Sequence, residues 1–347
     1  MHAKVLFSRW PVDPFIAAIA GMAGLASLAP AHGVGAVVAG YANQAAIALL
    51  FFLHGAKLEP KAALAGAWHW RLHVAVLLST YVLFPVLGLG AHALFPNLLP
   101  PALWTGVILL CVLPSTVQSS IAFTSIARGN VPAALCAATA SNLLGMGLTP
   151  LLAGLLLHAQ GGFSVHVVGG IAFQLLLPFA LGQLARPFIG DWISREKKLL
   201  GLVDRGSILL VIYVAFSEGV THGIWNQLDA SSLLSLLAVN AVLLAAVLGV
   251  TTLASRALGF SRADEITLVF CGSKKSLASG LPMATVLLGG QAAGLVMLPL
   301  MLFHQIQLMV CAELARRYAG RMEAVVGFPV ARPGGVAGRT PVRINHG

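Results

Sequence analysis

The sequence predicts an all-α polytopic membrane protein with ten transmembrane helices, arranged as two inverted five-helix repeats whose fourth and ninth helices are broken. Three features support this fold class: an apolar composition, ten apolar runs of spanning length, and basic residues confined to alternate connections. Hydrophobic residues make up 58% of the 347 residues and charged residues 9%, and the mean hydropathy is +0.88. Soluble chains carry about 45–50% apolar and about 25% charged residues. This composition excludes a cytosolic enzyme, a nucleic-acid-binding protein and a disordered scaffold.

The apolar runs have the length that a bilayer requires, about 20 predominantly apolar residues. They cover residues 14–30, 34–54, 72–94, 100–127, 131–157, 163–185, 205–223, 231–255, 264–289 and 292–315. The connections are short and leave no room for a soluble domain between spans. We therefore expect a first five-helix repeat over residues 1–160 and a second, inverted repeat over 161–319. The Pro-, Gly- and Arg-containing stretch 320–347 is expected to be a disordered cytoplasmic tail.

The N-terminal run has an alternative interpretation. Lys4 and Arg9 precede an apolar run that ends in Ala29-Pro30-Ala31, a pattern that also fits a signal peptide with an Ala-x-Ala cleavage site. Cleavage would leave nine spans and two unequal halves.

The basic residues define the expected orientation. Nineteen of the 21 Lys and Arg residues lie at the termini or in alternate connections, and the opposite connections, near residues 32, 96, 160, 225 and 290, hold none. The positive-inside rule then places both termini in the cytoplasm of a plasma (inner) membrane. The net charge of +10 is thus explained by the orientation of the chain in the membrane. The same basic residues are also attracted to anionic lipid. It does not indicate a nucleic-acid partner.

Two of the runs are interrupted at corresponding positions in the two halves. Pro114 interrupts the fourth run because it lacks an N–H and clashes with the preceding turn. Gly272, followed by Gly280 and Pro282, weakens the ninth. Unwound backbone at membrane depth requires surrounding protein or a water-lined cavity. Paired interruptions in the two halves are the best sequence pointer to a transporter binding site, although proline kinks and hydroxyl clusters also serve helix packing.

Polar side chains near these interruptions are the candidate binding residues. A lysine at a helix centre costs roughly 2.5–3.5 kcal/mol and usually faces a cavity or an ion pair, so we expect at least one of the two adjacent lysines of the ninth run to line the transport site. The polar residues of the fifth and tenth runs could line the site or join helices. The candidate substrate- or ion-binding residues are Ser115, Thr116, Gln118, Ser119, Ser120, Thr139, Ser141, Asn142, Ser273, Lys274, Lys275, Ser276, His304 and Gln307.

Catalytic and cofactor motifs are absent from the sequence. It contains no GxSxG, HExxH or P-loop motif, the histidines show no metal-ligand spacing, and the four cysteines show no disulfide pattern. We therefore expect neither an enzyme nor a cofactor or metal site. A secondary transporter fits these features best.

Five segments resemble the bile acid:sodium symporter superfamily. Three of them, PSTVQSSIAFTSIARGNV (114–131), TPLL (149–152) and CGSKKSLASGLPM (271–283), carry the resemblance to the superfamily. The last of these, with DRGSILLVIY (204–213) and LPLMLFHQIQ (298–307), is most similar to the solute carrier family 10 member 7 branch, of bacterial type. The resemblance implies a panel domain of spans one, two, six and seven and a core domain of the other six. Spans four and nine would cross at their breaks.

The resemblance also implies where sodium binds in related proteins, and this chain departs from that pattern. A Ser-Asn pair of span four matches Ser119 and Ser120 only after a one-residue length adjustment, and the span-five hydroxyl positions align with Ala134 and Ala138. The acidic position of span nine falls at or beside Cys271.

The glutamine region of span nine holds the two lysines of this chain. Losing a carboxylate and gaining an ammonium argues against sodium coupling. A lysine could occupy the cation site permanently, pair with an anionic substrate, or deprotonate during proton coupling. Lys275 is the stronger candidate because it aligns with the Lys-Ser dipeptide of the branch.

The expected function is a secondary active, symporter-like transporter of a small organic anion, with alternating access at the crossing of the broken helices. Sodium and protons both stay open as coupling ions, and so does the oligomeric state. The alternative is a regulatory membrane protein that affects calcium or cell-envelope homeostasis and transports little itself.

Overall fold

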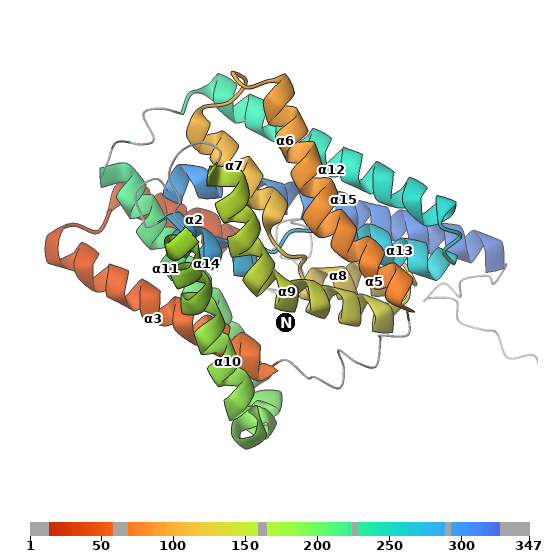
Figure 1. The fold of residues 1–347 in the computed structure, drawn as a ribbon, viewed down its shortest axis with the longest axis horizontal. Coiled ribbons are helices and arrows are strands. Elements are labelled where there is room, and N and C mark those ends of the chain that lie inside the picture. Colours follow the sequence, from red (N-terminus) through yellow and green to blue (C-terminus); the bar gives the residue numbers. More distant parts are fainter. Residues whose placement is uncertain are drawn as a thin grey trace, which may run out of the picture.

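The computed structural model describes residues 14–57, 69–158, 165–221, 223, 228–288 and 293–326, and all regular elements in this part of the chain are helices (Figure 1). Every run expected to span the membrane contains helix. The elements are α2 (Pro14–Leu28), α3 (Gly33–Lys57), α5 (Trp70–Leu78), the π-helix η3 (Ser79–Leu83), α6 (Phe84–Leu94), α7 (Pro101–Val112), α8 (Gln118–Ile126), α9 (Val131–His158), α10 (Val165–Arg195), α11 (Lys197–Thr221), α12 (Ala230–Ala257), α13 (Arg262–Gly272), α14 (Leu277–Leu288) and α15 (Ala293–Val326).

Six helical stretches are long and apolar enough to cross a membrane. They are Gly33–Lys57, Trp70–Leu94, Val131–Leu157, Lys198–Thr221, Ala230–Ala257 and Gly294–Gly320. The fourth and ninth predicted spans are each divided into two shorter helices, α7 with α8 and α13 with α14. The all-helical class is thus confirmed for the described residues, with six helices able to span a membrane, whereas the total of ten spans and the inverted repeat remain predictions.

Three boundaries lie eight or more residues from the sequence-based ranges. Helix α10 continues to Arg195 and α11 already begins at Lys197. Both helices thus extend beyond their apolar runs into the charged segment that separates those runs. Helix α15 extends to Val326, so residues 320–326 of the expected tail are helical. The remainder of that tail, 327–347, lies outside the described residues.

The helices pack in two groups. Helices α2, α3, α10 and α11 contact one another, and the second group comprises α5 to α9 and α12 to α15. In Figure 1, α3 and α10 lie at the lower left, and α6, α12 and α15 run across the right. The groups meet where α10 contacts α9 and α14 and where α11 contacts α14 and α15. These contacts frame the cavity described below.

Helices α3 and α10 approach closely because glycines meet backbone at the crossing. A β-carbon on Gly55 would overlap the carbonyl of Phe179, and one on Gly182 would overlap the carbonyl of Phe52. The Gln183 side-chain amide also donates to the Gly55 carbonyl over 2.7 Å. Small residues that let helix backbones touch are the usual basis of packing in membranes. This crossing positions the last turn of α3, which carries charged residues.

Candidate functional site

The first break separates α7 from α8 and frees a row of backbone carbonyls. Pro114 has no N–H, and the chain stays non-helical until α8 begins. Side chains of α9 satisfy two of these carbonyls: Thr149 Oγ1 donates to the Val112 carbonyl over 2.7 Å, and the Asn142 amide donates to that of Ser115. Because an unpaired buried backbone group costs free energy, these bonds hold the break in one conformation.

The second break lies between α13 and α14, and its carbonyls are satisfied partly by the first broken helix. The last three carbonyls of α13 accept hydrogen bonds from the hydroxyls of Ser79, Ser115 and Ser120, at 2.9, 2.6 and 3.2 Å. Ser115 lies in the first break, and Ser120 lies in α8. The backbone N–H of Ser276 also donates to the Pro114 carbonyl over 2.8 Å. The two breaks are therefore in direct contact.

An amide side chain of the following helix fixes each break. Gln307 of α15 accepts from the Lys275 N–H and donates to the Lys275 carbonyl, both over 2.9 Å. Its amide nitrogen also lies 2.8 Å from His304 Nδ1. Asn142 of α9 has the corresponding role at the first break, at the carbonyl of Ser115. These residues join helices at the crossing, one of the two roles that the sequence left open.

The structure places both lysines of the ninth span, which are expected to line a transport site, away from the wall of this cavity. Both lysines are fully buried, at 0% exposure, and neither lines the cavity. Lys275 Nζ donates to three backbone carbonyls. Lys274 Nζ donates to the Ser119 carbonyl over 3.0 Å and lies 3.6 Å from the ring centroid of Phe123. Both lysines lie in the non-helical break between α13 and α14. The angular spacing of residues in an α-helix therefore does not give the direction of their side chains.

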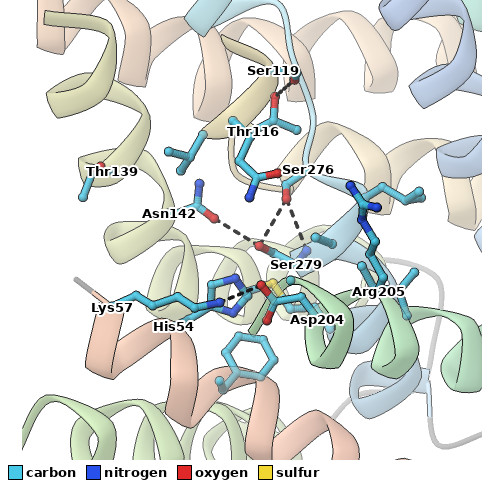
Figure 2. Close-up of a pocket in the computed structure, with 18 of the residues that line it drawn as sticks. His54, Lys57, Thr116, Ser119, Thr139, Asn142, Asp204, Arg205, Ser276 and Ser279 are labelled. Atoms are coloured by element: carbon cyan, nitrogen blue, oxygen red, sulfur yellow. Dashed lines mark hydrogen bonds and ion pairs between the residues drawn. The ribbon is translucent and has the colours of Figure 1, made fainter. Parts of the chain in front are cut away.

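A cavity of about 620 Å³ lies beside the crossing, between the two groups of helices. The first turn of α8 and the first turn of α14, with the residue before each, form part of its wall. In Figure 2, hydrogen bonds connect Asn142, Ser279 and Ser276 on this wall, where Ser279 Oγ donates to Asn142 Oδ1 over 3.0 Å. Small-molecule sites commonly have volumes of about 300–1,000 Å³. The space therefore suits a small organic molecule.

The opposite wall of the cavity carries charge. Lys57 Nζ, at the end of α3, forms an ion pair with Asp204 Oδ2 of α11 over 2.7 Å, and His54 lies beside them (Figure 2). Arg205 lines the cavity as well, with its guanidinium carbon 5.5 Å from the ring centroid of Phe15. Within the described residues, no carboxylate lies within 4 Å of Arg205. Asp204 is the one acidic residue among those that line the cavity in this part of the chain.

The predicted site residues fall into two groups. Those that line the cavity are Thr116, Gln118, Ser119, Thr139, Asn142, Ser276 and His304. Those that lie in the packed crossing are Ser115, Ser120, Ser141, Ser273, Lys274, Lys275 and Gln307. Among the described residues, no group of three or more His, Cys, Asp or Glu side chains could hold a metal ion.

The charged wall was not predicted from the sequence, because Lys57 and Arg205 are among the nineteen basic residues counted there at the termini or in alternate connections. A usable signal was present: Asp204 and Arg205 are adjacent, and apolar residues follow them from Ile208 to Phe216 almost without interruption. Helix α11 begins at Lys197 and carries this pair in its third turn.

Two interrupted helices that meet beside a cavity between helix groups form the arrangement in which secondary transporters bind substrate. The fold and the site thus define a membrane transporter. The chain matches the SBF-like CPA transporter family (DUF4137) over residues 13–320. It belongs to that family, which confirms the resemblance found in the sequence.

Individual proteins are also similar to this chain. The chain is 54% identical over 313 residues to the Escherichia coli protein named "Putative symporter YfeH", covering 90% of this chain and 94% of that protein. It is 53% identical over 317 residues to "Uncharacterized protein PA2026" of Pseudomonas aeruginosa, covering 91% and 95%. Identity to sodium/bile acid cotransporter 7 of Mus musculus is 28% over 271 residues, covering 76% of this chain and 79% of that protein.

Proposed function

We propose that the protein is a secondary active, symporter-like transporter of a small organic anion. The cavity between the two helix groups holds the substrate, and relative movement of the groups gives alternating access to the two sides of the membrane. The observation that carries this proposal is the guanidinium of Arg205, which lines the cavity without a carboxylate partner among the described residues.

Charge within the cavity favours an anion over a cation. The described lining residues include Lys57 and Arg205 as cations and Asp204 as the acid, so the two positive charges less the one negative charge leave +1. The first turns of α8 and α14 add to this field, because a helix N-terminus carries about half a positive charge and presents unpaired N–H groups. Apolar residues complete the wall, which fits a carboxylate or sulfonate with an apolar body.

The membrane arrangement proposed with this function has ten spans in an inner membrane, two inverted repeats over residues 1–160 and 161–319, and both termini in the cytoplasm. Each break is held by an amide side chain of the following helix, Asn142 at the first and Gln307 at the second. This similarity between the two halves supports the repeat. Lys57 and Arg205 belong to the basic residues of the cytoplasmic side. The charged wall then lies toward the cytoplasm, in contact with membrane lipid headgroups around it.

We propose that sodium is not the coupling ion of this transporter. The crossing, where sodium-coupled relatives are expected to bind the ion, is packed here around two buried ammonium groups, Lys274 and Lys275. Coupling to protons or exchange of one anion for another then supplies the driving force.

The test is ligand-induced thermal stabilisation of the purified protein, because a ligand that binds the folded state raises its melting temperature by mass action. Aliphatic and aromatic carboxylates and sulfonates are compared with their neutral amides, for the wild type and Arg205→Gln. Lys198→Gln is the matched control, since Lys198 is an exposed cation of the same helix.

We expect stabilisation by one or more acids, none by the amides, and loss of the effect in Arg205→Gln alone. Stabilisation by amides and acids alike, or equal responses of Arg205→Gln and the wild type, would contradict an anion site in this cavity.

A further inference from the structure

We propose that the crossing contains a site for a small monovalent cation and that the ammonium group of Lys275 permanently occupies it. The site consists of three backbone carbonyls, those of Thr80, Cys111 and Leu113. Removal of the side chain would leave a site that accepts ammonium, methylammonium or an alkali cation. The inference is independent of the proposed function, because the site needs no substrate.

The carbonyl of Thr80 lacks a backbone donor for two reasons. In an α-helix it would accept from the N–H of Phe84, but in the π-helix η3 that N–H donates to the Ser79 carbonyl instead. A π-helical bond would require the N–H of the next residue, which is Pro85 and has none. The π-turn and the proline together leave this buried carbonyl for Lys275 Nζ, which lies 2.8 Å away.

The other two carbonyls are freed by the first break. The N–H of Ser115, which would bond the Cys111 carbonyl in a continuous helix, donates to Ser141 Oγ over 3.1 Å. Leu113 is extended, with ψ of 153°, and follows the last helical residue of α7. Carbonyls at a helix C-terminus carry a partial negative charge and attract cations. Both accept from Lys275 Nζ, over 2.7 Å for Cys111 and 2.8 Å for Leu113.

Donors and acceptors match in number at this site. An ammonium group has three N–H donors and no acceptor, and Lys275 Nζ meets three carbonyl oxygens. The Phe84 ring centroid lies 4.1 Å from Nζ, a distance at which the ring face attracts a cation. Within the described residues no carboxylate pairs with Lys275, so dipoles and a ring alone stabilise the buried charge. Gln307 holds the backbone of Lys275 from the other side.

Lys274 provides a matched comparison. It is adjacent and equally buried, but the one carbonyl to which it donates is that of Ser119, and Phe123 covers it. Removing Lys274 would therefore leave no group of converging carbonyls. A cation that rescues Lys275→Ala should have no such effect on Lys274→Ala.

The experiment measures the melting temperatures of the wild type, Lys275→Ala and Lys274→Ala in equal concentrations of choline, sodium, potassium, ammonium and methylammonium chloride. Choline is too large for the site and controls for ionic strength. We expect the wild type to be indifferent to the cation and Lys275→Ala to be selectively restabilised by at least one small cation. At ten times its Kd, a cation would change the folding equilibrium about 11-fold. Lys275→Met, whose apolar chain fills the space, should not respond.

The variants are also purified in methylammonium or choline throughout, in case Lys275→Ala is too unstable to survive. Recovery of folded Lys275→Ala in methylammonium but not in choline supports the site. The inference is overturned if no small cation stabilises or recovers Lys275→Ala, if Lys274→Ala or Lys275→Met responds equally, or if sodium stabilises the wild type as much as Lys275→Ala.

Discussion

The ion pair between Lys57 and Asp204 gives a prediction in which stability and anion binding change in opposite directions. Its atoms lie 2.7 Å apart, and the side chains are 28% and 18% exposed. Exposed pairs contribute about 0.2–1 kcal/mol, and breaking a fully buried pair costs about 3–5 kcal/mol. This half-buried pair lies between these limits, so Asp204→Asn should lower the free energy of unfolding by about 1–2 kcal/mol.

The same substitution changes the cavity charge from +1 to +2, because Asp204 is its one acid among the described lining residues. Asp204→Asn should therefore bind a carboxylate more tightly than the wild type although the free protein is less stable. Lys57→Met should be less stable and should also bind the carboxylate more weakly. In the double variant no buried charge is left without its partner, and much of the lost stability should return.

The assay is a double-mutant cycle on denaturant unfolding in detergent, with carboxylate binding measured by thermal shift on the same four proteins. We expect a coupling free energy of about 1–2 kcal/mol. Glu313→Gln is the control, since Glu313 pairs with Arg316 and Arg317 on the surface and should change less. Additive effects of the two substitutions, or weaker carboxylate binding by Asp204→Asn, would contradict the proposed role of this wall.

Three further predictions concern the scaffold. Gly55→Ala should lower the melting temperature because its β-carbon overlaps the backbone of α10, whereas Gly40→Ala in the same helix has open space and should be neutral or stabilising, since alanine is favoured by about 0.8–1.0 kcal/mol; equal effects would contradict the close crossing. Gln307→Leu leaves a buried N–H and carbonyl of Lys275 unpaired and should lower the free energy of unfolding, measured with denaturant, by about 2–4 kcal/mol; a variant as stable as the wild type would contradict the role of Gln307 at the second break. Hydrogen bonds from Ser232 and Ser231 hold the pKa of Asp229, the N-cap of α12, at about 2, below its ordinary 3.8. Because the pKa of Asp229 is lowered in the folded state, the ionised carboxylate stabilises the fold at pH values above its ordinary pKa, and this stabilisation is lost as the pH falls from about 4 toward 2. The melting temperatures of Asp229→Ala and the wild type should therefore differ at pH 7 and converge in acid; a difference that does not change with pH would contradict the capping role of Asp229.

The broken helices could be predicted from sequence because their causes are local. Pro114 removes a helical hydrogen bond wherever it is placed in a helix interior, and the Gly272-Ser273 step weakens a helix in any environment. Their alignment in the two halves of the chain then placed a site near both. The structure brings these two breaks into direct contact, through the bond from the Ser276 N–H to the Pro114 carbonyl.

The direction of Lys275 could not be predicted because it depends on carbonyls that are distant in sequence. The carbonyl of Thr80 is available only because η3 is π-helical and Pro85 follows it, and neither fact affects the ninth span until the helices pack. A buried lysine in a transporter suggests a ligand site by charge alone. Here the fold supplies the acceptors, and the ammonium points into the protein.

The charged wall of the cavity was missed for a related reason. Hydropathy places Lys57 and Arg205 at the ends of apolar runs, where cations usually belong to loops. The helices continue past those ends, and the last turn of α3 contacts α11 through the ion pair between Lys57 and Asp204. The packing of the helices, and not the local sequence, therefore places Lys57 and Arg205 in the wall of the cavity.

The central claim, that the cavity carries an organic anion across the membrane, is tested most directly by counterflow in proteoliposomes. Vesicles loaded with an unlabelled acid that stabilises the protein are diluted into a trace of the same labelled acid without a sodium gradient. We predict transient accumulation of label above equilibrium with the wild type and Lys198→Gln, and none with Arg205→Gln. An acid that binds at Arg205 but never accumulates above passive leak would contradict transport and favour a regulatory membrane protein.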